Sequence, residues 1–167
     1  MLPTIYCNHL SKGPTIYLKF HLTKDKIDSI QLACNDKKNL SFEILAQDPK
    51  TFLVEEIESW LKEYSKGTDP KFFLPLNLEG LSPFAKKVTL CLQQLNFGKK
   101  CSYQELAIMS GVKNAVRAAA TVCRKNQFPF IIPCHRIIYT NGQIGNYSAG
   151  LGMETKKVLL NFEEQKK

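Results

Sequence analysis

The sequence predicts an α+β protein in which a small unit of strands and one helix precedes a mostly helical unit. Two runs rich in β-forming residues lie within the first 34 residues, and one amphipathic helical pattern follows them. After a stretch rich in turn-forming residues at 68–83, three helical patterns follow one another. We therefore expect an N-terminal unit at residues 1–78 and a C-terminal unit at residues 79–167.

In the N-terminal unit, the expected strands are 15–22 and 27–34. The four polar residues between them predict a hairpin. Asp48 and Pro49 suit the N-cap and the first position of a helix, and Gly67 suits its end. The helix between them is expected from apolar residues at helical spacing: Phe52, Leu53, Ile57, Trp60, Leu61 and Tyr64.

A short extended segment at 72–76 leads into the C-terminal unit. Its first helix is expected to begin with Ser82 as N-cap and Pro83 as first residue. Ser102 and Glu105 have the spacing of a capping box, which predicts the start of a second helix. The first of these helices has one apolar stripe: Phe84, Val88, Cys91, Leu92 and Leu95.

The second and third helices of this unit form a candidate helix-turn-helix. The second helix is expected to end at Ser110-Gly111, and the third to cover 114–125. An ordinary pair of packed helices is the structural alternative. The third helix carries basic side chains and also small residues that favour close approach to a groove: Ala115, Ala118 and Ala119.

The composition is typical of a globular protein, with 44% hydrophobic and 23% charged residues among 167. This excludes a disordered chain, a collagen and a coiled coil. No apolar run approaches the ~20 residues that cross a bilayer, and no signal-peptide pattern is present at the N-terminus. We expect a cytoplasmic protein, or a nuclear one if the source is eukaryotic, with no membrane contact.

The charge is concentrated in the C-terminal unit. The first 80 residues carry 10 basic and 11 acidic side chains, whereas the remaining residues carry 13 and 4. A basic half on a nearly neutral half indicates a polyanion partner, with a solvated lysine-rich surface as the alternative. The chain has six cysteines and no CxxC pair, so we expect reduced thiols and no disulfide framework.

Residues 130–138 form an apolar run that is expected to be a strand, interrupted by Pro133, Cys134, His135 and Arg136. Proline cannot donate to a sheet ladder, so the chain is expected to turn or to lie at the sheet edge there. Such a break in local pattern is typical of a functional site. A thiolate is the nucleophilic form of cysteine, and a neighbouring histidine and arginine favour it. Because neighbours on a strand face opposite sides, contact between the thiol and the imidazole requires a turn or a bridging water. A buried structural thiol and a satisfied core histidine are the structural alternatives.

The segment 132–137, Ile-Pro-Cys-His-Arg-Ile, resembles the active-site signature of the O6-alkylguanine-DNA alkyltransferases, the methylated-DNA–protein-cysteine methyltransferases. The resemblance covers roughly residues 82–164 and implies a ribonuclease-H-like N-terminal domain and a winged helix-turn-helix C-terminal domain. Further matching motifs occur in the family's order: Ser102-Tyr103-Gln104-Glu105-Leu106-Ala107, Arg117-Ala118, Asn126, Gly145-Asn146-Tyr147-Ser148 and Leu159-Leu160-Asn161-Phe162-Glu163.

The resemblance implies irreversible transfer of an alkyl group from O6-alkylguanine, and from O4-methylthymine as a further candidate, to Cys134. His135 activates the thiol through a water, and Glu163 orients His135. Asn126 braces the turn between the third helix and the active-site segment. Arg136 has a structural hydrogen-bonding role.

The resemblance also implies the contacts with the flipped base. Tyr103 donates to guanine N3, and the backbone N–H of Ser148 binds O6. The carbonyls of Cys134 and Ile137 bind the exocyclic amine. The alkyl pocket is bordered by Tyr147, Ser148 and Ala149. Alanine at 149 stands where many members have glycine, which predicts a narrower pocket and slower reaction with O6-benzyl substrates.

Base flipping is expected, because O6 of a paired guanine lies inside the duplex. The resemblance implies that the helix-turn-helix enters the minor groove. Arg117 matches the residue that enters the stack in place of the base. The other expected DNA contacts are Ser102, Ala118, Arg124 and Lys125. The implied partner is double-stranded DNA bearing O6-alkylguanine, bound by a monomer without a cofactor.

A zinc site remains a minor hypothesis, since some members of the family bind zinc in the N-terminal domain. Cys7, His9, His21 and Cys34 are the available ligands, but their spacing matches no zinc motif, so we expect no metal. Two other functions stay open. One is a helix-turn-helix DNA-binding module with a sensing cysteine at position 134. The other is a Cys-His hydrolase, which also requires an oxyanion hole.

Overall fold

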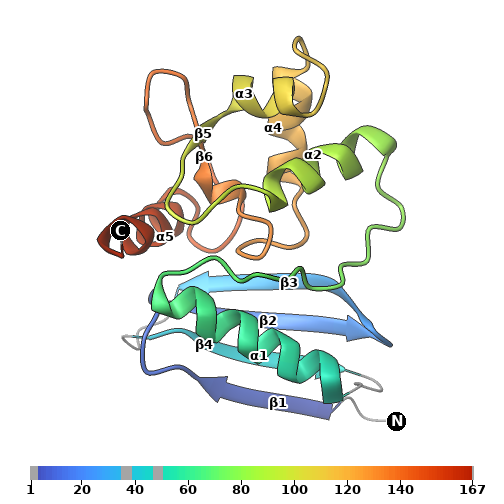
Figure 1. Cartoon of the computed structure of the whole chain (residues 1–167), viewed down its shortest axis with the longest axis vertical. Helices are drawn as coiled ribbons and strands as arrows, with labels where there is room; N and C mark the ends of the chain where they lie inside the picture. Colours follow the sequence, from blue (N-terminus) through green and yellow to red (C-terminus); the bar gives the residue numbers. More distant parts are fainter. Residues whose placement is uncertain (1–3, 35–38, 47–50, 167) are drawn as a thin grey trace.

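The computed structural model describes residues 4–34, 39–46 and 51–166. It combines a sheet and one helix in the N-terminal half with short helices in the C-terminal half, so the predicted α+β class is confirmed. Figure 1 shows the sheet with α1 across one face and the remaining helices beyond the β3 edge.

The sheet has the strand order β1-β4-β2-β3, with β1 at Thr4–His9, β2 at Ile16–Thr23, β3 at Lys26–Cys34 and β4 at Ser41–Ala46. Strands β2 and β3 are antiparallel, and Thr23 pairs with Lys26 across their turn, which confirms the predicted hairpin. Strands β2 and β4 run parallel, and β1 pairs antiparallel with β4. Strands β1 and β4 lie outside the predicted strands.

Helix α1 (Thr51–Lys66) packs its apolar stripe against the sheet. Alternate residues of β2 are buried, as expected for a strand with one face on the core. Helix α1 ends before Gly67, whose φ of +90° is a conformation that glycine adopts without strain. The predicted N-cap and first residue, Asp48 and Pro49, lie outside the described residues.

The C-terminal half contains α2 (Pro83–Gln93), α3 (Tyr103–Met109), α4 (Val116–Arg124) and α5 (Met153–Gln165). The predicted start of α2 is confirmed, because Ser82 accepts a hydrogen bond from the N–H of Ala85 and Pro83 opens the helix. The predicted capping box of Ser102 and Glu105 is also present at the start of α3.

Helix α4 is shorter than predicted. The expected start was residue 114, but Ala115 has φ −93° and ψ 31° and lies outside the helix. The N–H of Ala115 instead donates to the carbonyl of Val112, which closes a turn between α3 and α4. The turn between α3 and α4 is therefore longer than the helical pattern predicts.

Two segments outside the sheet, one from the end of the N-terminal unit and one from the C-terminal unit, are hydrogen-bonded to the edge strand β3. The N–H of Ile30 donates to the carbonyl of Gln127 at 2.8 Å. Residues 75–77 run beside Ile27, whose N–H donates to Pro75 at 2.9 Å, so the expected extended segment is present there. The division into 1–78 and 79–167 stays a prediction, because buried residues of both halves form one continuous cluster. None of the described helices has the length and apolar character that a membrane span requires.

Candidate active site

The segment containing Cys134 and His135 folds as a turn, which breaks the expected strand at the proline, as the sequence indicated. Residues Cys134–Arg136 make one 3-10 turn, η1, closed by a hydrogen bond of 2.9 Å from the N–H of Arg136 to the carbonyl of Pro133. Proline lacks the N–H that a ladder requires, so the chain leaves the extended conformation there. A strand of two residues, β6 (Ile137–Ile138), follows and pairs with β5 (Cys101–Ser102).

Asn126 holds the loop that leads from α4 to this turn. Its Nδ2 donates to the carbonyl of Ile132 at 3.0 Å and lies 3.1 Å from Sγ of Cys134. Its Oδ1 accepts from the N–H of Phe128 at 3.0 Å. The same loop contains Phe130 at φ +79°, a left-handed conformation that is costly for a residue with a side chain. The three bonds of Asn126 compensate for part of that cost.

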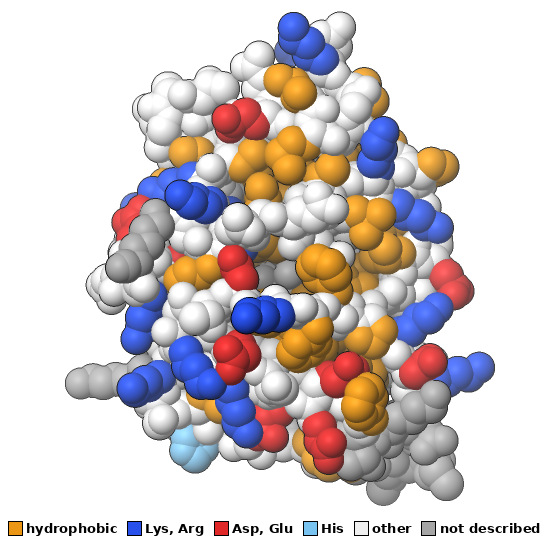
Figure 2. All heavy atoms as spheres, in the orientation of Figure 1, with side chains coloured by type: hydrophobic (Ala, Val, Ile, Leu, Met, Phe, Trp, Pro, Cys, Tyr) orange, Lys and Arg blue, Asp and Glu red, His pale blue; other side chains and the backbone are white. Residues whose placement is uncertain are grey.

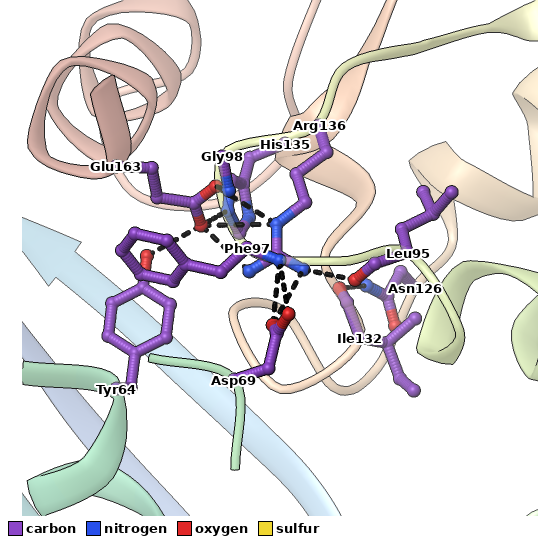
Figure 3. Close-up of polar contacts among 10 residues, drawn as sticks. All are labelled: Tyr64, Asp69, Leu95, Phe97, Gly98, Asn126, Ile132, His135, Arg136 and Glu163. Carbon is purple, nitrogen blue, oxygen red and sulfur yellow. Dashed lines mark hydrogen bonds and ion pairs between the residues drawn. The ribbon is translucent and has the colours of Figure 1, made fainter. Parts of the chain in front are cut away.

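Glu163 from α5 accepts hydrogen bonds from four residues of the site (Figure 3). Its Oε1 lies 2.9 Å from Nε2 of His135 and 2.8 Å from the hydroxyl of Tyr64. Arg136 donates from Nη2 to Oε1 at 2.9 Å and from Nε to Oε2 at 3.0 Å. The backbone N–H of Gly98 donates to Oε2 at 2.9 Å. The predicted partner of His135 is therefore in contact with it.

These contacts fix the protonation states of the pair. Burial opposes the charge on Glu163, but the hydrogen bond from His135 and the charge on Arg136 hold the pKa of the carboxyl below its usual range. Burial lowers the pKa of His135, and the adjacent carboxylate only partly opposes this. An ionised Glu163 beside a neutral His135 places the ring proton on Nε2, which leaves Nδ1 as an acceptor. Nδ1 is buried and has no hydrogen-bond partner among the described residues.

The guanidinium of Arg136 is bound to Glu163. Besides Glu163 it bonds to the carbonyl of Leu95, and its guanidinium lies 5.8 Å from the ring centroid of Phe97. The expectation that this arginine supports the thiolate is wrong, because its charge is engaged with Glu163. The structural role that the family resemblance implies for it agrees with these contacts.

The thiol of Cys134 is buried with 4% of the residue exposed. Burial raises its pKa, while the amide of Asn126, the ammonium of Lys156 and the hydroxyl of Tyr147 partly oppose that rise. The cysteine is therefore a neutral thiol in the absence of substrate, surrounded by groups that favour the anion once the proton leaves.

Lys156 was not among the predicted site residues. It is fully buried on α5, and its Nζ donates to the carbonyl of Ile137 at 2.5 Å. Burial lowers the pKa of this ammonium, and the thiols of Cys134 and Cys123 oppose that effect. One signal in the sequence marks it, since Lys156 shares the apolar stripe of α5 with Leu159 and Leu160. A lysine on such a stripe is rare without a buried partner.

A pocket of about 450 Å³ opens beside the thiol. Polar and aromatic side chains from α3, α4 and the loop before α5 surround it. Tyr103 packs against Tyr139 with ring centroids 5.6 Å apart, and burial raises its pKa to about 12, so its hydroxyl stays a donor. The predicted residues on this pocket are Tyr103, Arg117, Arg124, Cys134, Tyr147 and Ser148.

Several predicted residues lie elsewhere. Ser102 is buried, and its hydroxyl caps α3 and is not presented to DNA. Ala149 is not among the residues lining the pocket beside Cys134, and the narrower pocket stays a prediction. The carbonyl of Ile137 already accepts a hydrogen bond from Lys156. Ala119 is fully buried against the core and not on a groove-facing surface.

The remaining predicted DNA contacts are exposed. Arg117 lies in the first turn of α4, and Ala118 follows it. Arg124 and Lys125 are at the end of the same helix. On the face drawn in Figure 2, apolar side chains gather over the helical half, whereas acidic and basic side chains are mixed over the sheet half.

The zinc hypothesis is contradicted. Cys7 on β1 and Cys34 on β3 belong to opposite edge strands of the sheet. Sγ of Cys34 instead lies 3.0 Å from the hydroxyl of Thr155. No cluster of three or more histidine, cysteine or acidic side chains suited to a metal occurs in the described part of the chain.

Comparison with known proteins gives a consistent result. The family model described as the 6-O-methylguanine DNA methyltransferase DNA binding domain matches residues 83–165. A probable methylated-DNA–protein-cysteine methyltransferase of Acanthamoeba polyphaga mimivirus is 33% identical over 150 residues, which cover 89% of this chain and 98% of that protein. The methylated-DNA–protein-cysteine methyltransferase of Methanosarcina barkeri is 33% identical over 87% of this chain and 96% of its own length.

A shorter match has higher identity. The constitutive methylated-DNA–protein-cysteine methyltransferase of Bacillus subtilis is 38% identical over 108 residues, and the match spans 65% of this chain and 64% of that protein. Among solved structures, Mycobacterium tuberculosis OGT in complex with DNA has a TM-score of 0.64 and 25% identity, covering 85% of this chain and 83% of that one.

Proposed function

The chain belongs to the methylated-DNA–protein-cysteine methyltransferase family, and we propose on this premise that it repairs DNA by moving the alkyl group of O6-alkylguanine onto Cys134. One observation carries the proposal. The thiol of Cys134 lines a pocket of about 450 Å³ and is surrounded by donors that favour its anion. A helix-turn-helix module with a sensing cysteine is not favoured, because the relatives matched along nearly their whole length are methyltransferases.

The transfer is a displacement at the alkyl carbon. Sγ of Cys134 attacks that carbon, the bond between the carbon and O6 breaks, and the electron pair of that bond passes to guanine. The proton of the thiol passes to Nδ1 of His135, which is buried and has no hydrogen-bond partner among the described residues. A water relays it, as the family resemblance implies. Glu163 stabilises the imidazolium that forms, since its carboxylate lies 2.9 Å from Nε2.

Hydrogen-bond donors stabilise the negative charge that develops on the leaving guanine, which then takes up a proton from water. Tyr103 lines the pocket and keeps its phenolic proton at neutral pH, so it is the donor to guanine N3. The backbone N–H of Ser148, on the opposite loop of the pocket, is the donor to O6. Both groups are present before substrate binds, which avoids a cost of reorganisation during the reaction.

Entry of the base requires flipping, at a cost of about a few kcal/mol. Arg117 is exposed on the first turn of α4 and lines the pocket, so its side chain is placed to fill the vacated position in the stack. The groups named here all come from one chain, and we propose that a monomer acts. The product is a thioether at Cys134, and none of the described residues around it supplies a group that would hydrolyse a carbon–sulfur bond, so each chain reacts once.

The proposal is tested by counting repaired bases. Duplex DNA with a single O6-methylguanine is incubated with a limiting amount of protein, and unmodified guanine is measured by nucleoside chromatography. We expect one guanine restored per protein chain and none with Cys134→Ser. Repair of many guanines per chain would contradict the single-use mechanism, and no repair by the unaltered chain would refute the proposed activity.

A further inference from the structure

Tyr64 extends from the N-terminal half into the active site. It lies in the last turns of α1, is fully buried, and donates from its hydroxyl to Oε1 of Glu163 at 2.8 Å. Figure 3 shows it on the side of the carboxylate away from Leu95 and Asn126. No other side chain of α1 or of the sheet makes a hydrogen bond to the active-site residues in the described part of the chain.

The oxygen that Tyr64 contacts is the one that holds His135. Oε1 of Glu163 accepts from the hydroxyl of Tyr64 and also from Nε2 of His135, at 2.8 and 2.9 Å. A hydroxyl on a shared acceptor reduces the negative charge that faces the imidazole, so the two donors are electrostatically coupled. The other groups facing this carboxylate are Arg136 from η1, with Asp69 3.9 Å beyond it, and the N–H of Gly98.

The aromatic surroundings keep the hydroxyl in place. The ring of Tyr64 packs edge-on against Phe130 at 4.4 Å and Phe97 at 5.1 Å between centroids. It stacks with Trp60 and Phe162 at 5.7 Å each. These rings come from both halves of the chain. Burial raises the pKa of Tyr64 well above its usual value, so the phenol remains a donor at every working pH.

We propose that Tyr64 is a positioning residue of the alkyl-transfer reaction, through which the N-terminal half sets the basicity and orientation of His135 by way of Glu163. The inference rests on the proposed function, because His135 acts as a base only in that reaction. It assigns the N-terminal half a part in the chemistry beyond its packing role.

Tyr64→Phe removes the hydroxyl and retains the ring in the aromatic cluster. Oε1 then carries more charge toward His135, and the pKa of His135 rises. Since only the neutral imidazole accepts the thiol proton, the acid limb of the rate–pH profile moves to higher pH, by about half a unit.

The experiment measures single-turnover methyl transfer from O6-methylguanine duplex as a function of pH. It compares the unaltered chain, Tyr64→Phe and the matched control Tyr17→Phe. Tyr17 also donates to a carboxylate, that of Glu43, but on the sheet. The pKa of His135 is measured in parallel by NMR titration, which is tractable because the chain has three histidines.

The expected result is a shifted acid limb and a raised His135 pKa in Tyr64→Phe, with neither change in Tyr17→Phe. In a Glu163→Gln background, Tyr64→Phe should produce no further shift. A slower but unshifted profile in Tyr64→Phe, with the pKa of His135 unchanged, would overturn the inference and leave Tyr64 a packing residue. No transfer by the unaltered chain would instead refute the proposed function.

Discussion

Replacing Asn126 with alanine removes three hydrogen bonds from the loop between α4 and η1. The bonds join the side chain to the N–H of Phe128, the carbonyl of Ile132 and Sγ of Cys134, at 3.0, 3.0 and 3.1 Å. Phe128 and Ile132 are buried, so their backbone groups lose a partner that water does not readily replace. At about 1 kcal/mol for each bond, the expected loss of unfolding free energy is roughly 3 kcal/mol.

The assay is urea denaturation combined with single-turnover alkyl transfer. The urea concentration at the unfolding midpoint should fall, and the dependence of the unfolding free energy on urea should stay the same, since the surface exposed on unfolding is the same. Transfer should slow at least about tenfold, because the thiol loses a donor that favours its anion. Asn126→Asp separates the two effects, since it keeps an acceptor for Phe128 but places a charge beside the sulfur of Cys134. It should therefore lose more activity than stability.

Gln127→Ala is the matched control, because the side chain of Gln127 is exposed and its bond to Ile30 is made by the backbone carbonyl, which the substitution keeps. Its midpoint and transfer rate should equal those of the unaltered chain. The proposed role of Asn126 is wrong if Asn126→Ala lowers the free energy of unfolding by less than about 1 kcal/mol and transfers the alkyl group at the normal rate. Three hydrogen bonds of ordinary strength predict a larger loss of stability.

Three further results are expected. The free energy of unfolding should fall as pH drops below about 6.5, where His135 protonates in the unfolded chain, and again below about 4.5, where Glu163 does. Both pKa values are lower in the folded chain, so the unfolded chain binds more protons in these ranges. A urea midpoint that stays constant across that pH range would contradict this. Lys156→Met should raise the pKa of Cys134 and slow its alkylation by iodoacetamide at neutral pH, and an unchanged rate would exclude an electrostatic role for the ammonium. Ala149→Gly should react with an O6-benzylguanine duplex within about twofold of the rate of the unaltered chain, because Ala149 does not line the pocket. A large acceleration would instead support the narrower pocket that the sequence predicts.

Local signals in the sequence predicted the starts of α2 and α3 correctly. Ser82 before Pro83 and the pair of Ser102 with Glu105 each specify a cap through contacts within three residues, and both are present. Strands β1 and β4 were missed, because their pairing partners are remote in sequence. The side chains of β1 are exposed from Ile5 to His9, so no alternating burial pattern marks it.

The motif around Cys134 was identified from the sequence, and its proline indicated a break in the strand, but the 3-10 turn at Cys134–Arg136 was not predicted as such. An apolar run predicts a strand, whereas the proline and the bonds of Asn126 produce a turn. Tyr64 has no sequence signal that distinguishes it from the core residues of α1, because its partner Glu163 is 99 residues away. The position of Lys156 on the apolar stripe of α5 was a sequence signal for a buried lysine, but only the structure shows its partner, the carbonyl of Ile137.

The central claim is that Cys134 accepts the alkyl group, and intact mass spectrometry tests it most directly. After incubation with a duplex carrying O6-methylguanine, the chain should gain about 14 Da, the mass of one methyl replacing one hydrogen. Peptide mapping should place the gain on the peptide containing Cys134, and Cys134→Ser should show none. An unchanged mass despite retained DNA binding, or a methyl group located on Cys123, would contradict the account.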